Sequence, residues 1–211
     1  MDFDGPLRAL LLQRAVPGDP LSTVTDDDRA TEIFCSVFRR LHQGSFTGTH
    51  QSISEHFSAI ARYQQMRVAT GGPLPLWWVD RAADYLTNLA SSNGETELLH
   101  GDLHHDNILH DGGEWVVIDP KGIIGDPHFD VIQYLLNYPG RGGDPEAVLA
   151  RRMAMMTEQL TLDAQRIAMW GIAKGILDAC WALEDGADWR SGLHTAERFE
   201  RWLAQSGHSK G

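Results

Sequence analysis

The sequence has few cysteines, little positive charge and no long apolar run. Its two cysteines, Cys35 and Cys180, lie inside helical patterns, so we expect reduced core thiols rather than a disulfide. No apolar stretch is long enough to span a bilayer, and the acidic start at residues 1–4 is unlike the basic start of a signal peptide. These features predict a cytoplasmic protein without a membrane partner. They carry no signal for an oligomeric state.

The low content of positively charged residues argues against one class of partner, nucleic acids. The 211 residues have a formal net charge of −11, whereas nucleic-acid binding depends on basic patches that release counterions, so we expect no nucleic-acid partner. Acidity is compatible with a small cationic substrate, whose approach it would speed, and equally with a role in solubility alone. Hydrophobic residues make up 42% of the chain, which is enough for one folded core.

Polar residues that suit metal and proton chemistry gather in the middle of the chain. Asp102 and Asn107 lie five residues apart in the segment 100–107, and Asp119 follows Asp102 by 17 positions. Between Asn107 and Asp119, two short strand-like segments flank Asp111-Gly112-Gly113, whose residues tolerate positive φ and predict a hairpin. The hairpin would bring Asn107 and Asp119 together, and their side-chain oxygens are the ligands that Mg²⁺ prefers.

The spacing is similar to the catalytic loop of kinases, with Gly101 where protein kinases carry Arg. Together with Ile118-Asp119-Pro120 and the segment 125–130, it resembles the aminoglycoside phosphotransferase family, in the branch of streptomycin 6-kinases and hydroxyurea phosphotransferases. The resemblance implies a kinase that uses ATP and Mg²⁺ to phosphorylate a hydroxyl group of an aminoglycoside, with streptomycin as the first expectation. A kinase for hydroxyurea or another metabolite, and a non-catalytic remnant, are the alternatives.

The same resemblance implies roles for individual residues. Asp102 would be the catalytic base, and Asn107 and Asp119 would hold Mg²⁺; for each, the alternative is a turn-forming side chain. His100 would brace the loop. Asp130 would anchor the loop through backbone amides, unless it is only a helix N-cap.

The resemblance also implies binding segments outside the central motif. Gln13, Arg14 and Ala15 would form a hinge that binds adenine through its backbone. Asp178, Glu184 and Asp185 would offer carboxylates to the guanidinium groups of streptomycin. The histidines leave a zinc-dependent hydrolase as a distant alternative, although no cysteine lies near them. They are His100, His104, His105 and His110.

The fold class implied is α+β and mostly helical, namely the C-terminal lobe of a protein-kinase-like fold with a small β-hairpin at the active site. Residues 1–20 would be the last strand of an N-terminal lobe, at 7–13, and the hinge; residues 21–211 would be the helical lobe. A Gly-rich loop and a strand lysine have no room before the hinge, and the first lysine is Lys121. We therefore expect a chain that begins inside that lobe or has lost it, that binds ATP poorly and that has little or no turnover by itself.

Periodicity and capping residues predict the remaining elements. Thr25 with Asp28 is expected to cap a helix whose inward face includes Phe34 and Phe38, and residues 14–20 are expected to form a loop. The other expected helices are 52–68, 76–91, 131–138, one from 145, 163–183 and 193–205.

Overall fold

The computed structural model describes residues 2–4, 9–44, 48–91 and 96–208, and most of these are helical. The main helices are α1 (Asp27–Leu41), α3 (Ser58–Thr70), α4 (Leu76–Ser91), α6 (Pro145–Leu160), α7 (Ala164–Glu184) and α8 (Arg190–His208). Two short helices, α2 (Ile53–His56) and α5 (Ile132–Leu136), and three 3₁₀ turns, η1 (Leu21–Thr23), η2 (His105–Asn107) and η3 (Pro127–Phe129), complete the set. The predicted class, α+β and mostly helical, is confirmed.

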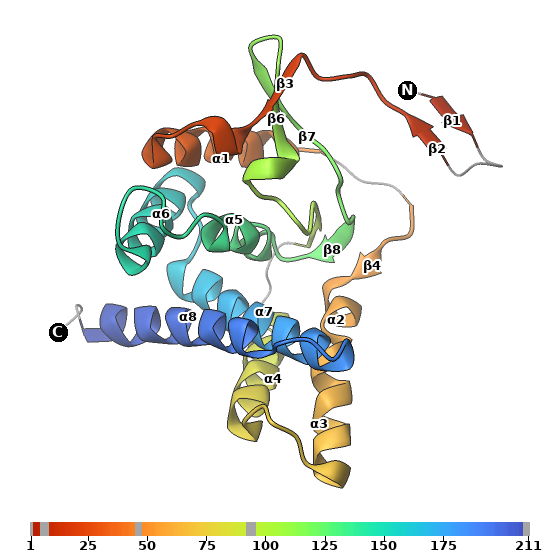
Figure 1. Ribbon diagram of the computed structural model, residues 1–211, viewed down its shortest axis with the longest axis vertical. Helices are drawn as coiled ribbons and strands as arrows, with labels where there is room; N and C mark the ends of the chain where they lie inside the picture. The colour runs from red at the N-terminus through yellow and green to blue at the C-terminus, as the bar shows by residue number, and fades with distance from the viewer. Residues whose placement is uncertain (1, 5–8, 45–47, 92–95, 209–211) are drawn as a thin grey trace.

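Three small sheets accompany the helices. β1 (Asp2–Asp4) and β2 (Ala9–Leu11) form an antiparallel pair that stands apart from the body (Figure 1). β3 (Pro17–Pro20), β6 (Ile108–Asp111) and β7 (Glu114–Val117) form an antiparallel sheet in the order β3-β6-β7. β4 (Gln51–Ser52), β8 (Ile123–Gly125) and β5 (Glu97–Leu99) form a mixed sheet in the order β4-β8-β5.

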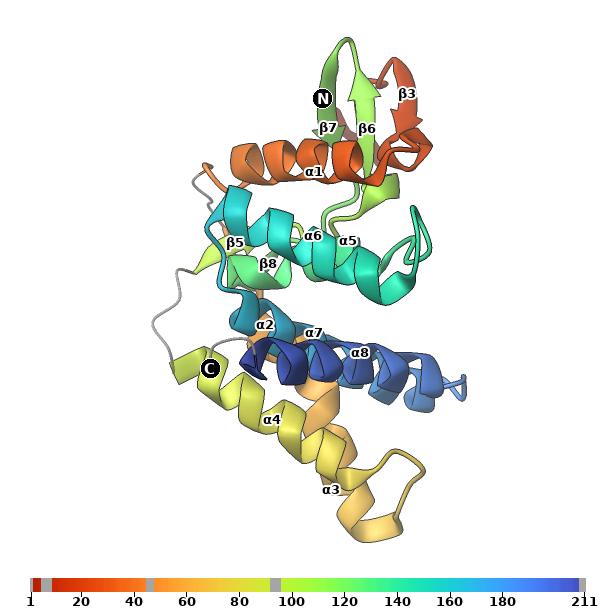
Figure 2. The ribbon, with the colours of Figure 1, turned by 90° about the vertical axis from the view of Figure 1, so that its left-hand side faces the viewer.

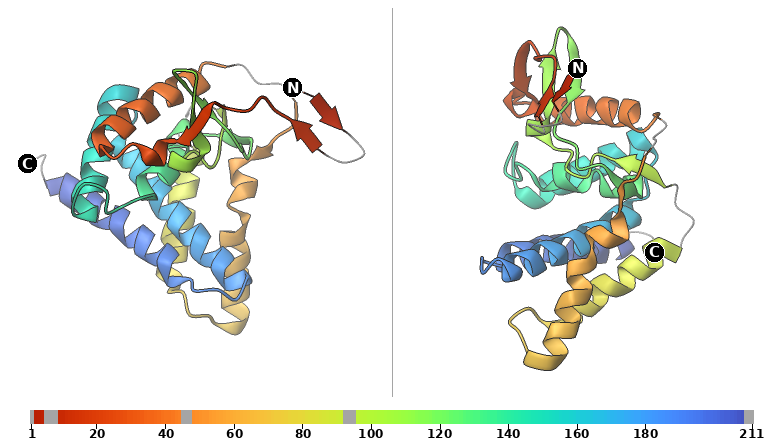
Figure 3. Two further views of the ribbon diagram at one scale, coloured as in Figure 1. Left: turned by 45° about the horizontal axis from the view of Figure 1, so that its top comes forward. Right: turned by 90° about the vertical axis from the view of Figure 1, so that its right-hand side faces the viewer.

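The elements stack in layers along the long axis of the molecule. Figure 2 shows the sheet of β3, β6 and β7 at one end, followed by α1, then α5 and α6, then α7 and α8, with α3 and α4 at the far end. The two further views of Figure 3 show the same succession. The sheet of β4, β8 and β5 lies beside the middle layers.

Helix α1 shows how local sequence builds these layers. Ala30, Ile33, Phe34, Val37 and Phe38 are buried on one face, as their spacing predicted. The N-cap was predicted one residue too early: it is Asp26, whose carboxylate accepts hydrogen bonds from the N–H groups of Asp28 and Arg29.

Three predicted elements differ from the structure. Residues 17–20 form β3 instead of a loop, because they pair with the free edge of β6 and prolines are tolerated on an edge strand. The helix expected over 52–68 is split at Phe57 into α2 and α3. The strand expected at 7–13 is β2 over residues 9–11, and its residues 7–8 lie outside the described part.

The core is closed by the tight packing of α7 against α8. A Cβ atom added to Gly175 would lie 2.6 Å from the backbone N of Ala196, and one added to Gly192 would lie 2.5 Å from the backbone O of Gly175. Glycine therefore lets the two backbones meet. Cys35 and Cys180 are buried and unbonded, as predicted, and burial raises the pKa of each thiol to about 12. Within the described residues, no helix is both long and apolar enough to cross a membrane.

Candidate active site

The predicted hairpin is present and it brings the two ends of the central motif together. β6 and β7 pair from Ile108–Val117 to Asp111–Glu114, and the connecting Gly112 and Gly113 have φ of 56° and 98°. Positive φ at both turn residues matches the right-handed twist of the strands. At the open end, Ile118 N–H donates to Asn107 O at 3.0 Å, so Asn107 lies beside the residue that precedes Asp119.

Asp102, Asn107 and Asp119 belong to one cluster. Asn107 Nδ2 donates to the backbone O of Asp102 at 2.9 Å, which leaves the amide oxygen of Asn107 as an available acceptor. Lys121 Nζ lies 3.0 Å from Asp119 Oδ2 and 3.5 Å from Asp102 Oδ2, so one ammonium group joins both carboxylates. Asp119 has φ of 57°, a left-handed conformation that aspartate tolerates better than most residues.

His100 ties the loop to the hairpin through both ring nitrogens. Its Nδ1 accepts from Asp102 N–H at 3.3 Å, so the ring proton is on Nε2, which contacts Ile118 O at 2.9 Å. Burial lowers the pKa of His100 and outweighs the opposing effect of the nearby Asp130 carboxylate. A neutral ring with this tautomer suits both contacts.

Asp130 receives the backbone of the loop. Its two carboxylate oxygens accept the N–H groups of His100 at 2.8 Å and Gly101 at 2.6 Å. Gly101 has φ of 80°, and a Cβ atom there would lie 2.8 Å from Cδ1 of Ile123 and 3.2 Å from Cβ of Lys121. The arginine of protein kinases therefore has no room at this position.

Two residues that were not predicted from the sequence, His42 and Glu97, lie on the side of Asp130 away from the loop. His42, which caps the C-terminus of α1, has Nδ1 2.5 Å from Glu97 Oε2 and Nε2 3.3 Å from Asp130 Oδ2. The ring also packs on Phe38, with centroids 4.0 Å apart. No local motif marks His42 or Glu97, because the three partners come together only in the folded chain.

Asp126 is a second anchor, on the turn after β8. Its carboxylate accepts from Trp170 Nε1 at 2.7 Å, Arg166 Nε at 2.5 Å and His128 Nδ1 at 2.6 Å. Burial alone would raise its pKa, but the hydrogen bonds from His128 and Trp170 lower it to about 2. His128 Nε2 then accepts from the N–H of Asp163, so the turn is joined to the start of α7.

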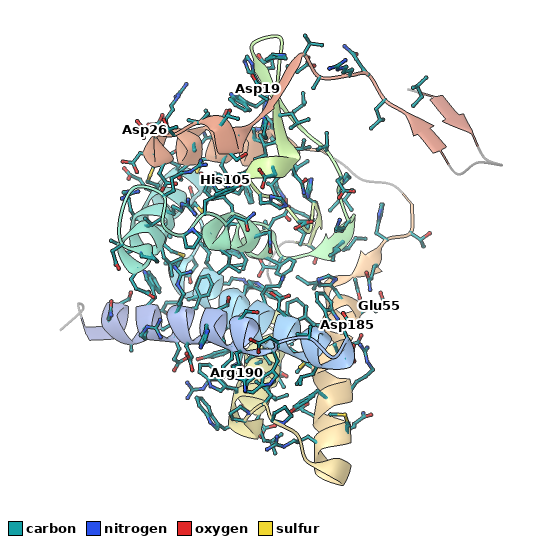
Figure 4. The ribbon with its side chains drawn as sticks, viewed as in Figure 1. Asp19, Asp26, Glu55, His105, Asp185 and Arg190 are labelled. Carbon is teal, nitrogen blue, oxygen red and sulfur yellow. The ribbon has the colours of Figure 1, made fainter. Side chains whose placement is uncertain are left out.

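His105 fills the space under the hairpin. Figure 4 labels it between α1 and α5, and its ring stacks on Tyr134 with centroids 4.0 Å apart and an interplanar angle of 9°. The ring is fully buried, and neither nitrogen has a hydrogen-bond partner among the described residues. Burial and the charge of Arg152 lower its pKa to about 3, so the ring is neutral.

The residues expected in the hinge lie away from this cluster. Gln13, Arg14 and Ala15 form an extended, mostly exposed segment between β2 and β3. The next residue, Val16, pairs with the hairpin tip, where its N–H donates to Asp111 Oδ1 at 2.9 Å. No contact found among the described residues joins the segment 13–15 to Asp102, Asn107 or Asp119.

The carboxylates expected at the substrate site lie on the last half of α7. Asp178 pairs with Lys174 at 2.6 Å, and Glu184 pairs with Arg62 at 2.9 Å, so both already have cationic partners. Asp185 is exposed at the end of the helix, on the same edge of the molecule as Glu55 of α2 in Figure 4. Asp178 and Asp185 are seven residues apart, which places them on one side of the helix.

The donor set of the cluster fits a hard cation held jointly with phosphates. Among the described residues, no three histidine, cysteine, aspartate or glutamate side chains converge into a metal-binding group. Asn107 and Asp119 supply oxygen atoms, and Mg²⁺ commonly takes one or two protein oxygens together with water and nucleotide phosphates. A zinc site needs three or four converging N or S ligands. The ring of His100 is engaged with the backbone, and that of His105 is stacked in the core.

The sequence of the chain is similar to a known family of kinases. The family model of the aminoglycoside/hydroxyurea antibiotic resistance kinases matches residues 4–186. Streptomycin 6-kinase of Streptomyces griseus is 30% identical over 191 residues, which cover 88% of this chain and 62% of that protein. Hydroxyurea phosphotransferase of Kitasatospora aureofaciens is 28% identical over 192 residues, with 88% and 54% covered. The chain thus spans a little over half to three fifths of the length of these two relatives.

Solved structures show the same fold at low identity. A choline/ethanolamine kinase family protein from Mesorhizobium loti superposes with a TM-score of 0.70 and 16% identity, covering 97% of this chain and 72% of that one. A thermostable mutant of aminoglycoside phosphotransferase APH(4)-Ia superposes with a TM-score of 0.64 and 19% identity, covering 92% and 71%. The protein-kinase-like fold predicted from the central motif is confirmed.

Proposed function

Because the chain belongs to the aminoglycoside/hydroxyurea antibiotic resistance kinase family, we propose that it transfers the γ-phosphoryl group of ATP to a hydroxyl group of a small cationic molecule. The clustering of Asp102, Asn107 and Asp119 on one loop and hairpin is the observation that carries this proposal. A related aminoglycoside phosphotransferase has been solved with AMP-PNP and hygromycin B, which supports a nucleotide as co-substrate. Because ATP is available in the cytoplasm, we propose that the reaction takes place there.

Each residue of the cluster has a separate part in the proposal. Asp102 accepts the proton of the attacking hydroxyl group, and its backbone is held by the amide of Asn107. Asn107 and Asp119 would hold Mg²⁺, which when bound neutralises phosphate charge and orients the nucleotide. His100 and Asp130 keep the loop in place.

The N-terminal part and the late helices are assigned in the same way. Residues 1–20 would be the last strand of the nucleotide-binding lobe and the hinge, with Gln13, Arg14 and Ala15 facing adenine, and residues 21–211 would be the catalytic lobe. Streptomycin is the favoured acceptor, since its guanidinium groups suit carboxylates on α7. Asp185 is the exposed member of that set. Asp178 and Glu184 would have to give up their ion pairs with Lys174 and Arg62 to bind streptomycin.

The experiment is an acceptor panel with product identification. Because weak ATP binding and low turnover are expected, the purified chain is incubated for a long time with excess ATP and Mg²⁺ and with either streptomycin or hydroxyurea. The product is identified by ³¹P NMR and mass spectrometry. We expect a phosphate ester on streptomycin that is absent with Asp102→Asn. A product with hydroxyurea alone would move the assignment to the second candidate, which the similarity to hydroxyurea phosphotransferase favours. Acceptor binding without any product would support a non-catalytic protein.

A further inference from the structure

A buried histidine stands where three separate segments meet behind the catalytic loop. His42 is the C-cap residue of α1, Glu97 is the first residue of β5, and Asp130 directly follows η3. His42 Nδ1 lies 2.5 Å from Glu97 Oε2, and His42 Nε2 lies 3.3 Å from Asp130 Oδ2. The side chain of His42 is 7% exposed and that of Asp130 is 0% exposed. One imidazole ring therefore faces a carboxylate at each nitrogen, largely shielded from water.

This arrangement favours a proton on both ring nitrogens. A neutral imidazole carries one N–H and presents a lone pair at the other nitrogen. Nε2 makes no aligned hydrogen bond, so its contact with Asp130 is electrostatic. A neutral ring gains little from a carboxylate 3.3 Å from Nε2, whereas an imidazolium is attracted to it by charge even without an aligned N–H. A buried carboxylate also needs a compensating charge, and His42 is the ion-pair partner that the described residues offer to Asp130.

The remaining charged groups around the ring do not replace His42. Arg39 of α1, with Asp126 and His128 of the turn before Asp130, lines the same cavity as His42 and Glu97, with a volume of about 390 Å³. Asp126 is engaged by His128, Arg166 and Trp170, and the Arg39 guanidinium donates to Gln159 O. Burial lowers the pKa of His42, but the contacts with Asp130 and Glu97 outweigh burial and raise it overall.

We propose that His42, as an imidazolium held between Glu97 and Asp130, is a positioning residue that fixes the backbone of the catalytic loop. Asp130 accepts the N–H groups of His100 and Gly101, the two residues directly before Asp102. The proton on His42 keeps the Asp130 carboxylate aligned with those two donors. Loss of that proton turns an attraction into a repulsion behind Asp130, and the loop loosens. The inference rests on the proposed function only in treating this loop as catalytic.

The first test reads the charge on His42 without any substrate. The imidazole resonances of His42, assigned in the wild type by through-bond correlation with its backbone, are followed by NMR from pH 5 to 10. We expect both nitrogens to be protonated at neutral pH, with a midpoint above the ordinary value of about 6.5. Glu97→Gln keeps a hydrogen-bond acceptor but removes a charge, so it should lower the midpoint. A midpoint at or below 6.5 in the wild type would overturn the proposal, and this reading does not need a folded His42 variant.

The second test reads the loop. Amide hydrogen exchange of His100 and Gly101 should be faster by about tenfold or more in His42→Gln at pH 6.5, because the acceptor of both N–H groups is released. The N–H of Ile167, which donates to Asp163 O in α7, serves as the internal control and should be unchanged. His194→Gln, at an exposed histidine of α8, is the matched variant and should leave all three amides unchanged.

Turnover gives the last reading. In the wild type, kcat should fall as pH rises through the His42 midpoint, while His42→Gln should be slow at every pH without that inflection. If the amide hydrogen-exchange rates of His100 and Gly101 are equal in wild type and His42→Gln, His42 only packs in the core and does not position the loop. Absence of turnover in the wild type would count against the proposed function alone, because the titration and exchange data are collected without ATP.

Discussion

Lys121 Nζ lies 3.0 Å from Oδ2 of Asp119, two residues before it in the chain. The same nitrogen lies 3.5 Å from Asp102 Oδ2, so the ammonium group occupies the space between the proposed base and a proposed metal ligand. A divalent cation that binds Asp119 has to compete with Lys121 for the carboxylate. On the proposed assignment, Lys121 is therefore expected to weaken the binding of a bare divalent cation.

Replacing this lysine should strengthen binding of a bare divalent cation. Lys121→Met removes two half-exposed ion pairs, each worth about 0.2–1 kcal/mol, so the affinity for Mn²⁺ should rise about twofold to thirtyfold. The measurement is an Mn²⁺ titration followed by EPR. Lys174→Met, which removes an ammonium group from α7, is the control and should not change it. Weaker Mn²⁺ binding by Lys121→Met would mean that the lysine assists the site.

Asp102→Asn should separate chemistry from folding. The backbone oxygen of Asp102, not its carboxylate, accepts from Asn107, so the loop should keep its conformation. Loss of a general base lowers turnover by about 10²- to 10⁴-fold. We expect that loss in kcat with a change in the free energy of unfolding within about 0.5 kcal/mol, measured by urea denaturation. Normal turnover would remove Asp102 from the mechanism.

Gly101→Ala should destabilise the protein through two separate effects. Its φ of 80° disfavours any side chain, and the new Cβ would meet Ile123 and Lys121. Together these should lower the free energy of unfolding by about 2–4 kcal/mol. Gly112→Ala is the matched control, because it has φ of 56° but no neighbour within 4 Å, and should cost about 1 kcal/mol. Equal losses in the two variants would show that Ile123 and Lys121 yield to the new Cβ.

The stability of the protein should fall in mild acid because of His105. Its pKa is lowered to about 3 in the folded chain, whereas the unfolded chain takes up a proton near 6.5. Stability is therefore lost as pH falls from 6.5 towards 3, and the His105 contribution should decrease by about 1.4 kcal/mol between pH 8 and pH 5.5.

The control for this effect is a variant that keeps an aromatic ring at position 105 but has no group that takes up a proton. His105→Phe can still stack on Tyr134, and it has no ring nitrogens to leave without partners. Urea unfolding at pH 8 and 5.5 should show a smaller loss for His105→Phe than for the wild type. The comparison also cancels His42, whose raised pKa contributes stability below pH 6.5 that is lost at higher pH. Identical pH dependence in both proteins would show that His105 takes up a proton in the folded state.

The sequence predicted the parts of the site that depend on local chemistry. Asp111-Gly112-Gly113 predicted the hairpin because glycine accepts positive φ, and the face of α1 followed from its helical period. The contacts of His42 with Glu97 and Asp130 span 55 and 88 positions and carry no local signal. Residues 17–20 have the composition of a turn, and only pairing with β6 makes them a strand.

The central claim is that Asp102, Asn107 and Asp119 form one site for a metal-bound nucleotide. Paramagnetic relaxation by Mn²⁺ bound with AMP-PNP tests it most directly, with side-chain amide and carboxyl resonances observed by NMR. We predict selective broadening of Asn107 and Asp119, with Asp102 next in strength and Asp178 of α7 unaffected. Broadening centred on other residues, with Asn107 and Asp119 left sharp, would contradict the account.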